Sequence, residues 1–169
     1  MWIRQYAPVS VICGEHETES VRLAAENLKR DLRRVLDCRL EDGAAESGNG
    51  NPALRILVET AGQARGICPG ADLARIRDEE GNLRREAYLL QEKDGELLIV
   101  GSDRRGTIYG IYEFCEEWLG VSPWYFFADV PVRAKREVEI PSGFVKADWP
   151  GVEYRGIFIN DEEELEHWV

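Results

Sequence analysis

The order in which strand and helix patterns alternate is the feature that most constrains the fold of this chain. A short apolar strand is predicted over residues 9–13, and apolar residues then recur at helical spacing over residues 21–36. Thr18 or Ser20 can cap that helix. The next strand is predicted over residues 54–59, so the chain opens with the order strand, helix, strand.

A hairpin and a second helix follow. Two apolar runs, residues 87–92 and 96–100, flank an Asp-Gly turn, which is a strong hairpin signal. Apolar residues between residues 108 and 119 lie on one face of a second predicted helix. Ser102 or Asp103 can cap this helix.

The remaining segments carry weaker patterns. Residues 43–52 are small and polar and are predicted as a loop, and residues 61–81 as a loop with a short helix at residues 72–76. A last short strand is predicted over residues 137–140. The full order predicts an α+β fold, an α/β sandwich in which two long helices pack on one face of one mixed β-sheet.

Composition limits the partners of the chain. Its 169 residues are enough for one domain with a sizeable core. The formal net charge of −11 argues against nucleic acid as the main partner, because phosphate binding requires a basic face. No apolar run approaches the ~20 residues of a membrane span, so no membrane partner is expected. The start carries no signal-peptide pattern, which slightly favours a cytoplasmic location and leaves secretion open.

Cysteines and histidines give no sign of a metal or redox site. Cys13, Cys38, Cys68 and Cys115 are widely spaced, and no Cys-x-x-Cys pair occurs. The two histidines lie in no metal-ligand spacing. We therefore interpret the cysteines as buried free thiols and expect no metal.

The turn over residues 101–107, Gly-Ser-Asp-Arg-Arg-Gly-Thr, joins a strand to a helix, which is where nucleotide-binding folds hold phosphates. Its glycines have the separation of a P-loop, but the lysine expected after the second glycine is absent. The glycine pattern of dinucleotide folds is incomplete as well. We therefore interpret this turn as a helix cap, with Gly106 and Gly110 allowing close packing on the sheet.

An apolar segment is followed by acidic residues near Val169. Residues 152–159 are predicted to form a buried strand, and Asn160, Asp161 and Glu162 come directly after it. Strands of a (β/α)₈ barrel present catalytic groups at their C-terminal ends in this way, and a barrel needs roughly 200 or more residues. The alternative is a solvated helix start, where acidic residues interact favourably with the helix dipole.

This interpretation divides the chain into two parts. Residues 1–148 would form an N-terminal accessory domain, and residues 149–169 the linker and first strand of a truncated (β/α)₈ catalytic barrel. The competing interpretation is a stand-alone carbohydrate- or protein-binding domain with a disordered acidic tail.

Three segments resemble a known family. Residues 101–114, from Gly-Ser-Asp-Arg-Arg-Gly-Thr-Ile-Tyr-Gly onward, resemble the strand–helix motif of N-terminal domains that precede glycosidase barrels, in hexosaminidase-type and α-glucuronidase-type enzymes. Residues 120–132 and 154–162 narrow the resemblance to glycoside hydrolase family 115, the xylan α-glucuronidases. The specific resemblance covers residues 101–162, and an N-terminal domain of a hexosaminidase-type glycosidase stays an alternative.

The resemblance implies an exo-acting, inverting enzyme that releases glucuronic or 4-O-methylglucuronic acid from xylan side chains without metal or cofactor. It implies that Asp161 orients the water or a sugar hydroxyl, with Asn160 hydrogen-bonding beside it. Glu162 and Arg104 are further candidate substrate-binding residues. The main acid and base, with the catalytic barrel, are expected outside these residues, so this chain alone is expected to be inactive.

Four consecutive aromatic residues, Trp124 to Phe127, form a dense patch after the second helix. Aromatic faces suit sugar rings, but a domain interface or core is the favoured interpretation. Alternation would place Trp124 and Tyr125 on opposite sides of the segment. An exposed side would lead the isolated chain to self-associate.

Overall fold

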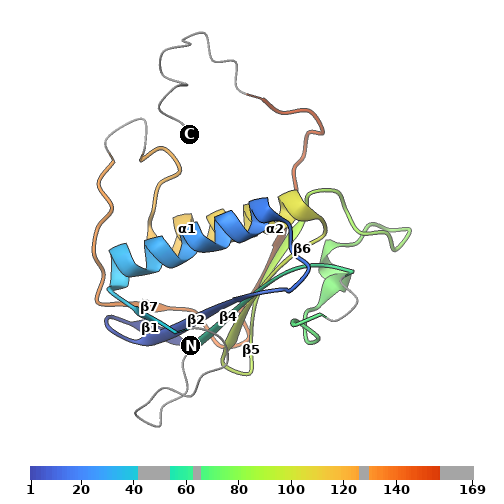
Figure 1. Ribbon diagram of the computed structural model, residues 1–169. Coiled ribbons are helices and arrows are strands. Elements are labelled where there is room, and N and C mark those ends of the chain that lie inside the picture. Colours follow the sequence, from blue (N-terminus) through green and yellow to red (C-terminus); the bar gives the residue numbers. More distant parts are fainter. Residues whose placement is uncertain (42–53, 63–65, 126–129, 157–169) are drawn as a thin grey trace.

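A six-stranded mixed sheet forms the centre of the protein (Figure 1). The computed structural model describes residues 1–41, 54–62, 66–125 and 130–156. In the order β3-β2-β4-β6-β5-β8, neighbours from β3 to β6 are parallel, while β5 and β8 are antiparallel to their neighbours. The strands are β2 (Pro8–Cys13), β3 (Arg39–Leu40), β4 (Leu54–Thr60), β5 (Tyr88–Lys93), β6 (Glu96–Gly101) and β8 (Val145–Asp148). The predicted mixed sheet is confirmed.

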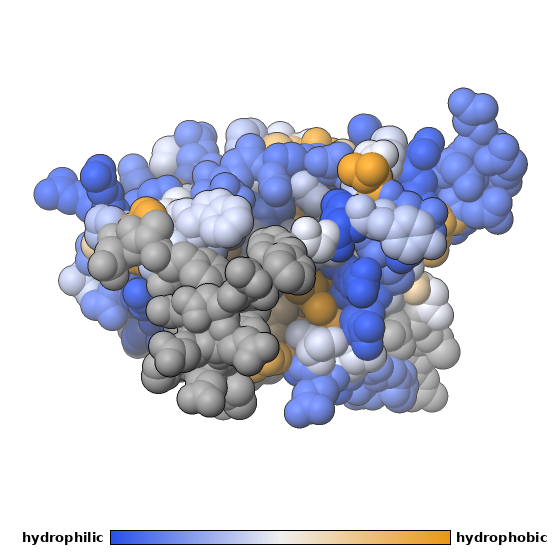
Figure 2. Space-filling model, turned by 90° about the horizontal axis from the view of Figure 1, so that it is seen from above, coloured by the Kyte–Doolittle hydropathy of each residue, from blue (hydrophilic) through white to orange (hydrophobic). Residues whose placement is uncertain are grey.

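Two helices, α1 (Glu19–Leu36) and α2 (Arg104–Phe114), cover one face of this sheet (Figure 1). α2 continues into a π-helical turn, η2 (Cys115–Leu119), and ends at Gly120 in the left-handed conformation that favours glycine. Apolar residues of α1 at helical spacing pack against the sheet and α2, whereas the outer surface of this layer is largely hydrophilic (Figure 2). The predicted packing of two helices on one face is confirmed.

The opposite face of the sheet is covered by a loop instead of helices. Residues 66–84, with the short 3₁₀ helix η1 (Leu73–Ile76), contribute Cys68 and Ile76 to a second core. Successive residues of β5 alternate between the two cores: Leu89 belongs to this one and Leu90 to the helix-covered one. The central hairpin is therefore buried on both faces.

The short strands at residues 2–4, 39–40 and 145–148 were not predicted from the sequence. β1 (Trp2–Arg4) and β7 (Glu137–Glu139) form a separate antiparallel pair, so the predicted strand at residues 137–140 exists but lies outside the main sheet. β8 takes the sheet edge beside β5, although Val-Lys-Ala-Asp offers only two apolar residues. Strands this short show too few alternations for period-2 patterning to detect.

The turn between β6 and α2 depends on a cap and two glycines. Asp103 Oδ1 accepts a hydrogen bond from the Gly106 N–H at 2.9 Å. A Cβ on Gly101 would lie 2.0 Å from Thr107 N, and a Cβ on Gly106 would lie 2.1 Å from the Ala87 carbonyl oxygen. The interpretation of this turn as a cap with close packing is confirmed at Asp103 and Gly106.

We expect Gly106→Ala to lower the free energy of unfolding by about 3 kcal/mol, the upper end for forced overpacking, because the obstructing atom is backbone. Gly14→Ala is the matched control, since its Cβ would meet no atom closer than 3.5 Å, and a change of at most about 1 kcal/mol is expected there. Urea denaturation monitored by circular dichroism measures both values. Equal unfolding midpoints for the two variants would contradict the close approach of α2 to β5.

Candidate functional site

The C-terminal edge of the parallel strands is occupied by side chains of the chain itself. Ligands of α/β sheets bind in the crevice at this edge. Here the carboxylate of Glu17, which is 6% exposed, accepts hydrogen bonds from Thr60 N–H at 2.5 Å and from Thr60 Oγ1 at 2.9 Å. The Thr60 hydroxyl lies 2.8 Å from that of Thr107 in the first turn of α2. A phosphate would meet this buried carboxylate at short range and be repelled, so the crevice offers no nucleotide site.

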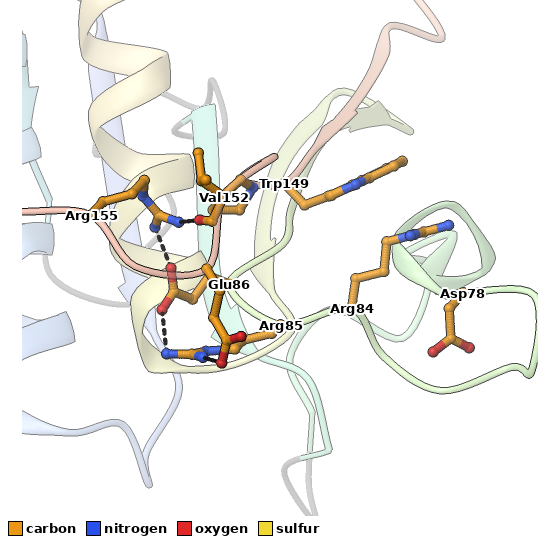
Figure 3. Close-up of a pocket in the computed structure, with 9 residues that line it drawn as sticks. Asp78, Arg84, Arg85, Glu86, Trp149, Val152 and Arg155 are labelled. Atoms are coloured by element: carbon orange, nitrogen blue, oxygen red, sulfur yellow. Dashed lines mark hydrogen bonds and ion pairs between the residues drawn. The ribbon is translucent and has the colours of Figure 1, made fainter.

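A cluster of charged side chains beyond this crevice is the strongest candidate site. Arg85, Glu86, Arg105, Glu153 and Arg155 form it, and we call it the Glu86 cluster. The Glu86 side chain is 3% exposed, and its Oε1 lies 3.0 Å from Arg105 Nη1 and 3.3 Å from Arg85 Nη2. Its Oε2 accepts a hydrogen bond from Arg155 Nη2. The Glu86 carboxylate thus lies between guanidinium groups from three segments of the chain. Figure 3 shows two of them, those of Arg85 and Arg155.

Glu86 is positioned by its backbone, which adopts a left-handed conformation with φ of 56°. Its N–H donates to Asp103 Oδ2 at 2.8 Å, and Ala87 N–H donates to Ser102 Oγ at 2.9 Å. Ser102 N–H in turn donates to the Ala87 carbonyl oxygen at 2.8 Å. A non-glycine residue holds such a conformation only where its surroundings fix it, and here the cap of α2 does so.

The three arginines keep Glu86 ionised. The hydrogen bond from Arg155 is the main cause that lowers the pKa of Glu86 below its ordinary value, burial opposes the effect, and Arg105 and Arg85 add to it. The pKa of Arg155 is raised by the same hydrogen bond. A carboxylate with a lowered pKa and three cationic partners is poorly suited to act as a general acid or base near neutral pH.

Arg155 links the segment that follows β8 to this cluster. Its Nη1 donates to the Val152 carbonyl oxygen at 2.5 Å, and its Nη2 donates to Tyr109 Oη at 3.2 Å as well as to Glu86. The Arg155 guanidinium carbon lies 5.7 Å from the centroid of the Tyr109 ring, within cation–π range. The segment is therefore attached to both β5 and α2 through one side chain.

Two further contacts hold the same segment. Arg85 Nη1 lies 2.6 Å from Glu153 Oε1, and the Arg84 guanidinium carbon lies 4.2 Å from the centre of the Trp149 ring (Figure 3). A cavity of about 320 Å³ opens beside Arg84 and Arg85, and another of about 350 Å³ opens beside Tyr109 on α2. The segment thus passes between two hollows and is held by charged and aromatic contacts.

Of the four sequence-predicted site residues, the structure describes only Arg104. Arg104 is exposed in the first turn of α2 and does not join it. Its neighbour Arg105 does join the cluster, through its ion pair with Glu86. The other three candidates lie outside the described residues: Asn160, Asp161 and Glu162.

Two other predicted segments are described in part. Residues 152–156 do not form the predicted buried strand: they are exposed, Tyr154 by 88%, and pair with no strand among the described residues. A strand is buried only where neighbours pair with its backbone, and residues 157–159 lie outside the description. In the aromatic patch, Trp124 is exposed whereas Tyr125 packs on the main core, as the alternation predicted, and Phe126 and Phe127 lie outside the description.

The four cysteines are free thiols, three of them buried and Cys13 partly so. Burial raises the pKa of Cys38 to about 11, which keeps that thiol protonated. Within the ranges that the structure describes, no group of His, Cys, Asp and Glu side chains could hold a metal ion. The same ranges contain no helix long and apolar enough to cross a membrane.

The fold and its motifs correspond to a known family. The chain belongs to the family of N-terminal domains of glycosyl hydrolase family 67, whose model matches residues 4–114. The solved structure of a family GH115 4-O-methyl-α-glucuronidase, with specificity for decorated arabinogalactans, is 36% identical with a TM-score of 0.77. That match covers 96% of this chain and 20% of that enzyme. The resemblance to the N-terminal part of α-glucuronidases is thereby confirmed.

A curated relative agrees with this assignment. Probable alpha-glucuronidase A of Aspergillus clavatus is 25% identical over 126 residues, which cover 67% of this chain and 14% of the relative. The chain spans between 14% and 20% of the length of these two proteins. The fold class is therefore that of the N-terminal domains that accompany glucuronidase-family glycoside hydrolases.

The lowered pKa of Glu86 leads to a pH dependence with a defined sign. In the unfolded chain Glu86 titrates at roughly pH 4.3, so its ionised form stabilises the fold above that pH and the contribution is lost as pH falls through the lower folded pKa. We expect Glu86→Gln to lower Tm at pH 7, and the difference from wild type to shrink as pH falls toward 3. Thermal denaturation at several pH values measures it. A difference that stays constant would contradict an ionised Glu86 paired with Arg85, Arg105 and Arg155.

Proposed function

We propose that this chain is the N-terminal accessory domain of an α-glucuronidase, an enzyme that releases glucuronic or 4-O-methylglucuronic acid from polysaccharide side chains. The observation that carries the proposal is the 36% identity to a GH115 4-O-methyl-α-glucuronidase over 96% of this chain. Residues 1–148 are the accessory domain, and residues 149–169 are the linker and first strand of a catalytic (β/α)₈ barrel. The barrel is the partner of this domain in the same polypeptide.

The proposed chemistry is an inverting hydrolysis. Such a site needs an acid and a base carboxyl roughly 6.5–9.5 Å apart with a water between them. Glu86, the buried carboxylate at the strongest candidate site, is paired with arginines and unsuited to either role. The main acid and base therefore belong to the barrel, and no metal or cofactor is required.

Glucuronoxylan is the first candidate substrate, because the sequence motifs resemble the xylan α-glucuronidases. Decorated arabinogalactan is the second candidate, since the solved neighbour has that specificity. Asp161 is proposed to orient the water or a sugar hydroxyl, and Asn160 to hydrogen-bond beside it. Glu162 and Arg104 are proposed as substrate-binding residues only in the assembled enzyme.

We expect the 169-residue chain to release no glucuronic acid from glucuronoxylan or arabinogalactan above a buffer control, because it lacks the proposed acid and base. Chromatographic detection of the released acid measures this. The full-length parent protein serves as the positive control. Release by the 169-residue chain itself would contradict the proposal.

In the full-length protein, Asp161→Ala is expected to lower kcat by about 100-fold or more, since one misplaced catalytic group costs that much. Glu164→Ala is the matched control, because Glu164 lies three residues further on and is assigned no role. Kinetics on an aldouronic acid, with a circular-dichroism melt for each variant, measure the effect. Wild-type turnover in Asp161→Ala would contradict the catalytic role and favour the alternative, in which Asp161 lies in a solvated first helical turn.

A further inference from the structure

We propose that Glu86, Arg85 and Arg105 form a docking site for residues 149–156 and set the direction in which the following chain leaves the domain. In the enzyme proposed above, and resting on that proposed function, Glu86 is then a positioning residue for the catalytic part. The occupant of the docking site is this segment of the same chain, which the structure places on it.

The segment is held by side chains and not by a strand ladder. β8 pairs with β5 as far as Asp148, opposite Tyr88. From residue 149 to residue 156, within the part of the chain that the structure describes, no backbone–backbone hydrogen bond joins the segment to the sheet or the helices. Its course is therefore fixed by the contacts of Trp149, Glu153 and Arg155.

Two of these three contacts depend on Glu86. Arg155 donates directly to its carboxylate, and Glu153 reaches it through Arg85. Glu86 also pairs with Arg105, so its negative charge separates three guanidinium groups that would otherwise repel one another. Replacing this carboxylate by a neutral amide removes the attraction and leaves the three cations together.

Glu86 is attached to both the sheet and α2. It lies two residues before β5, and its backbone N–H donates to Asp103, which also caps α2. The position of the docked segment is thus fixed relative to both the sheet and α2. Because cavities of about 320 and 350 Å³ flank the segment, close packing contributes little to holding it.

Backbone ¹⁵N relaxation on the 169-residue chain tests the docking. In the wild type we expect order parameters near 0.8 for residues 151–155, and in Glu86→Gln values below about 0.6 with β4 and β6 unchanged. Glu96→Gln is the control, because it removes the same charge from an ion pair with Arg55 at 2.5 Å on the sheet. Order parameters for residues 151–155 that stay near 0.8 in Glu86→Gln would overturn the proposal.

Arg155→Gln serves as the second variant in case Glu86→Gln fails to fold. It removes the segment's side of the ion pair and leaves Glu86 with Arg85 and Arg105. We expect the same loss of order in residues 151–155. A segment that remains ordered in this folded variant would equally overturn the docking site.

Kinetics of the full-length protein test the positioning role separately. We expect Glu86→Gln to lower kcat about tenfold, with KM changed by less than threefold, because misplacing catalytic groups reduces turnover. Glu96→Gln should retain wild-type kinetics. If the wild type releases no glucuronic acid, the proposed function fails while the relaxation result still decides the docking site. If Glu86→Gln retains full kcat in an active enzyme, the positioning role fails.

Discussion

The rest of the structure depends on the two oxygens of the Asp103 carboxylate. Oδ1 caps α2 through the Gly106 N–H, and Oδ2 holds the N–H of Glu86 in its left-handed conformation. One side chain thereby fixes the start of a helix, the entry into β5 and the place of a buried charge. This arrangement requires glycine at positions 101 and 106, because a Cβ at either position would overlap backbone atoms.

Most of the fold could be predicted because its main elements carry long, strong patterns. α1 has apolar residues at helical spacing through five turns, and the central hairpin has an Asp-Gly turn between apolar runs, with left-handed Asp94 and Gly95. Three short strands could not be predicted, since β1, β3 and β8 are only two to four residues long. Their pairing is decided by what lies beside them in space, which a local pattern does not contain.

The candidate site was missed for a related reason. Glu86 and Arg155 are separated by 69 positions, and each lies in a charged stretch that reads as solvated surface. The turn and cap of α2, which could be predicted, bring them together only because Glu86 takes a conformation that non-glycine residues rarely adopt. The motif Asp103 to Tyr109 carries part of the family resemblance, and its physical content is the cap by Asp103 together with the contact of Tyr109 to Arg155.

Glu17 fills the crevice at the edge of the sheet, and the arginines of the Glu86 cluster lie further out. At the C-terminal edge of the parallel strands, Glu17 satisfies the Thr60 N–H and hydroxyl, so the groups that would bind a ligand are already paired. The arginines lie further out, beside α2 and β5, where they surround Glu86 and the segment after β8. The crevice is filled by the chain's own side chains, and the buried Glu86 carboxylate is paired with the segment that follows β8. This arrangement supports the proposal that the domain holds another part of the polypeptide in a fixed orientation. In the proposed accessory role, the sheet and α2 hold Glu86 and Arg85 in place. These two side chains in turn hold Arg155 and Glu153 of the segment after β8.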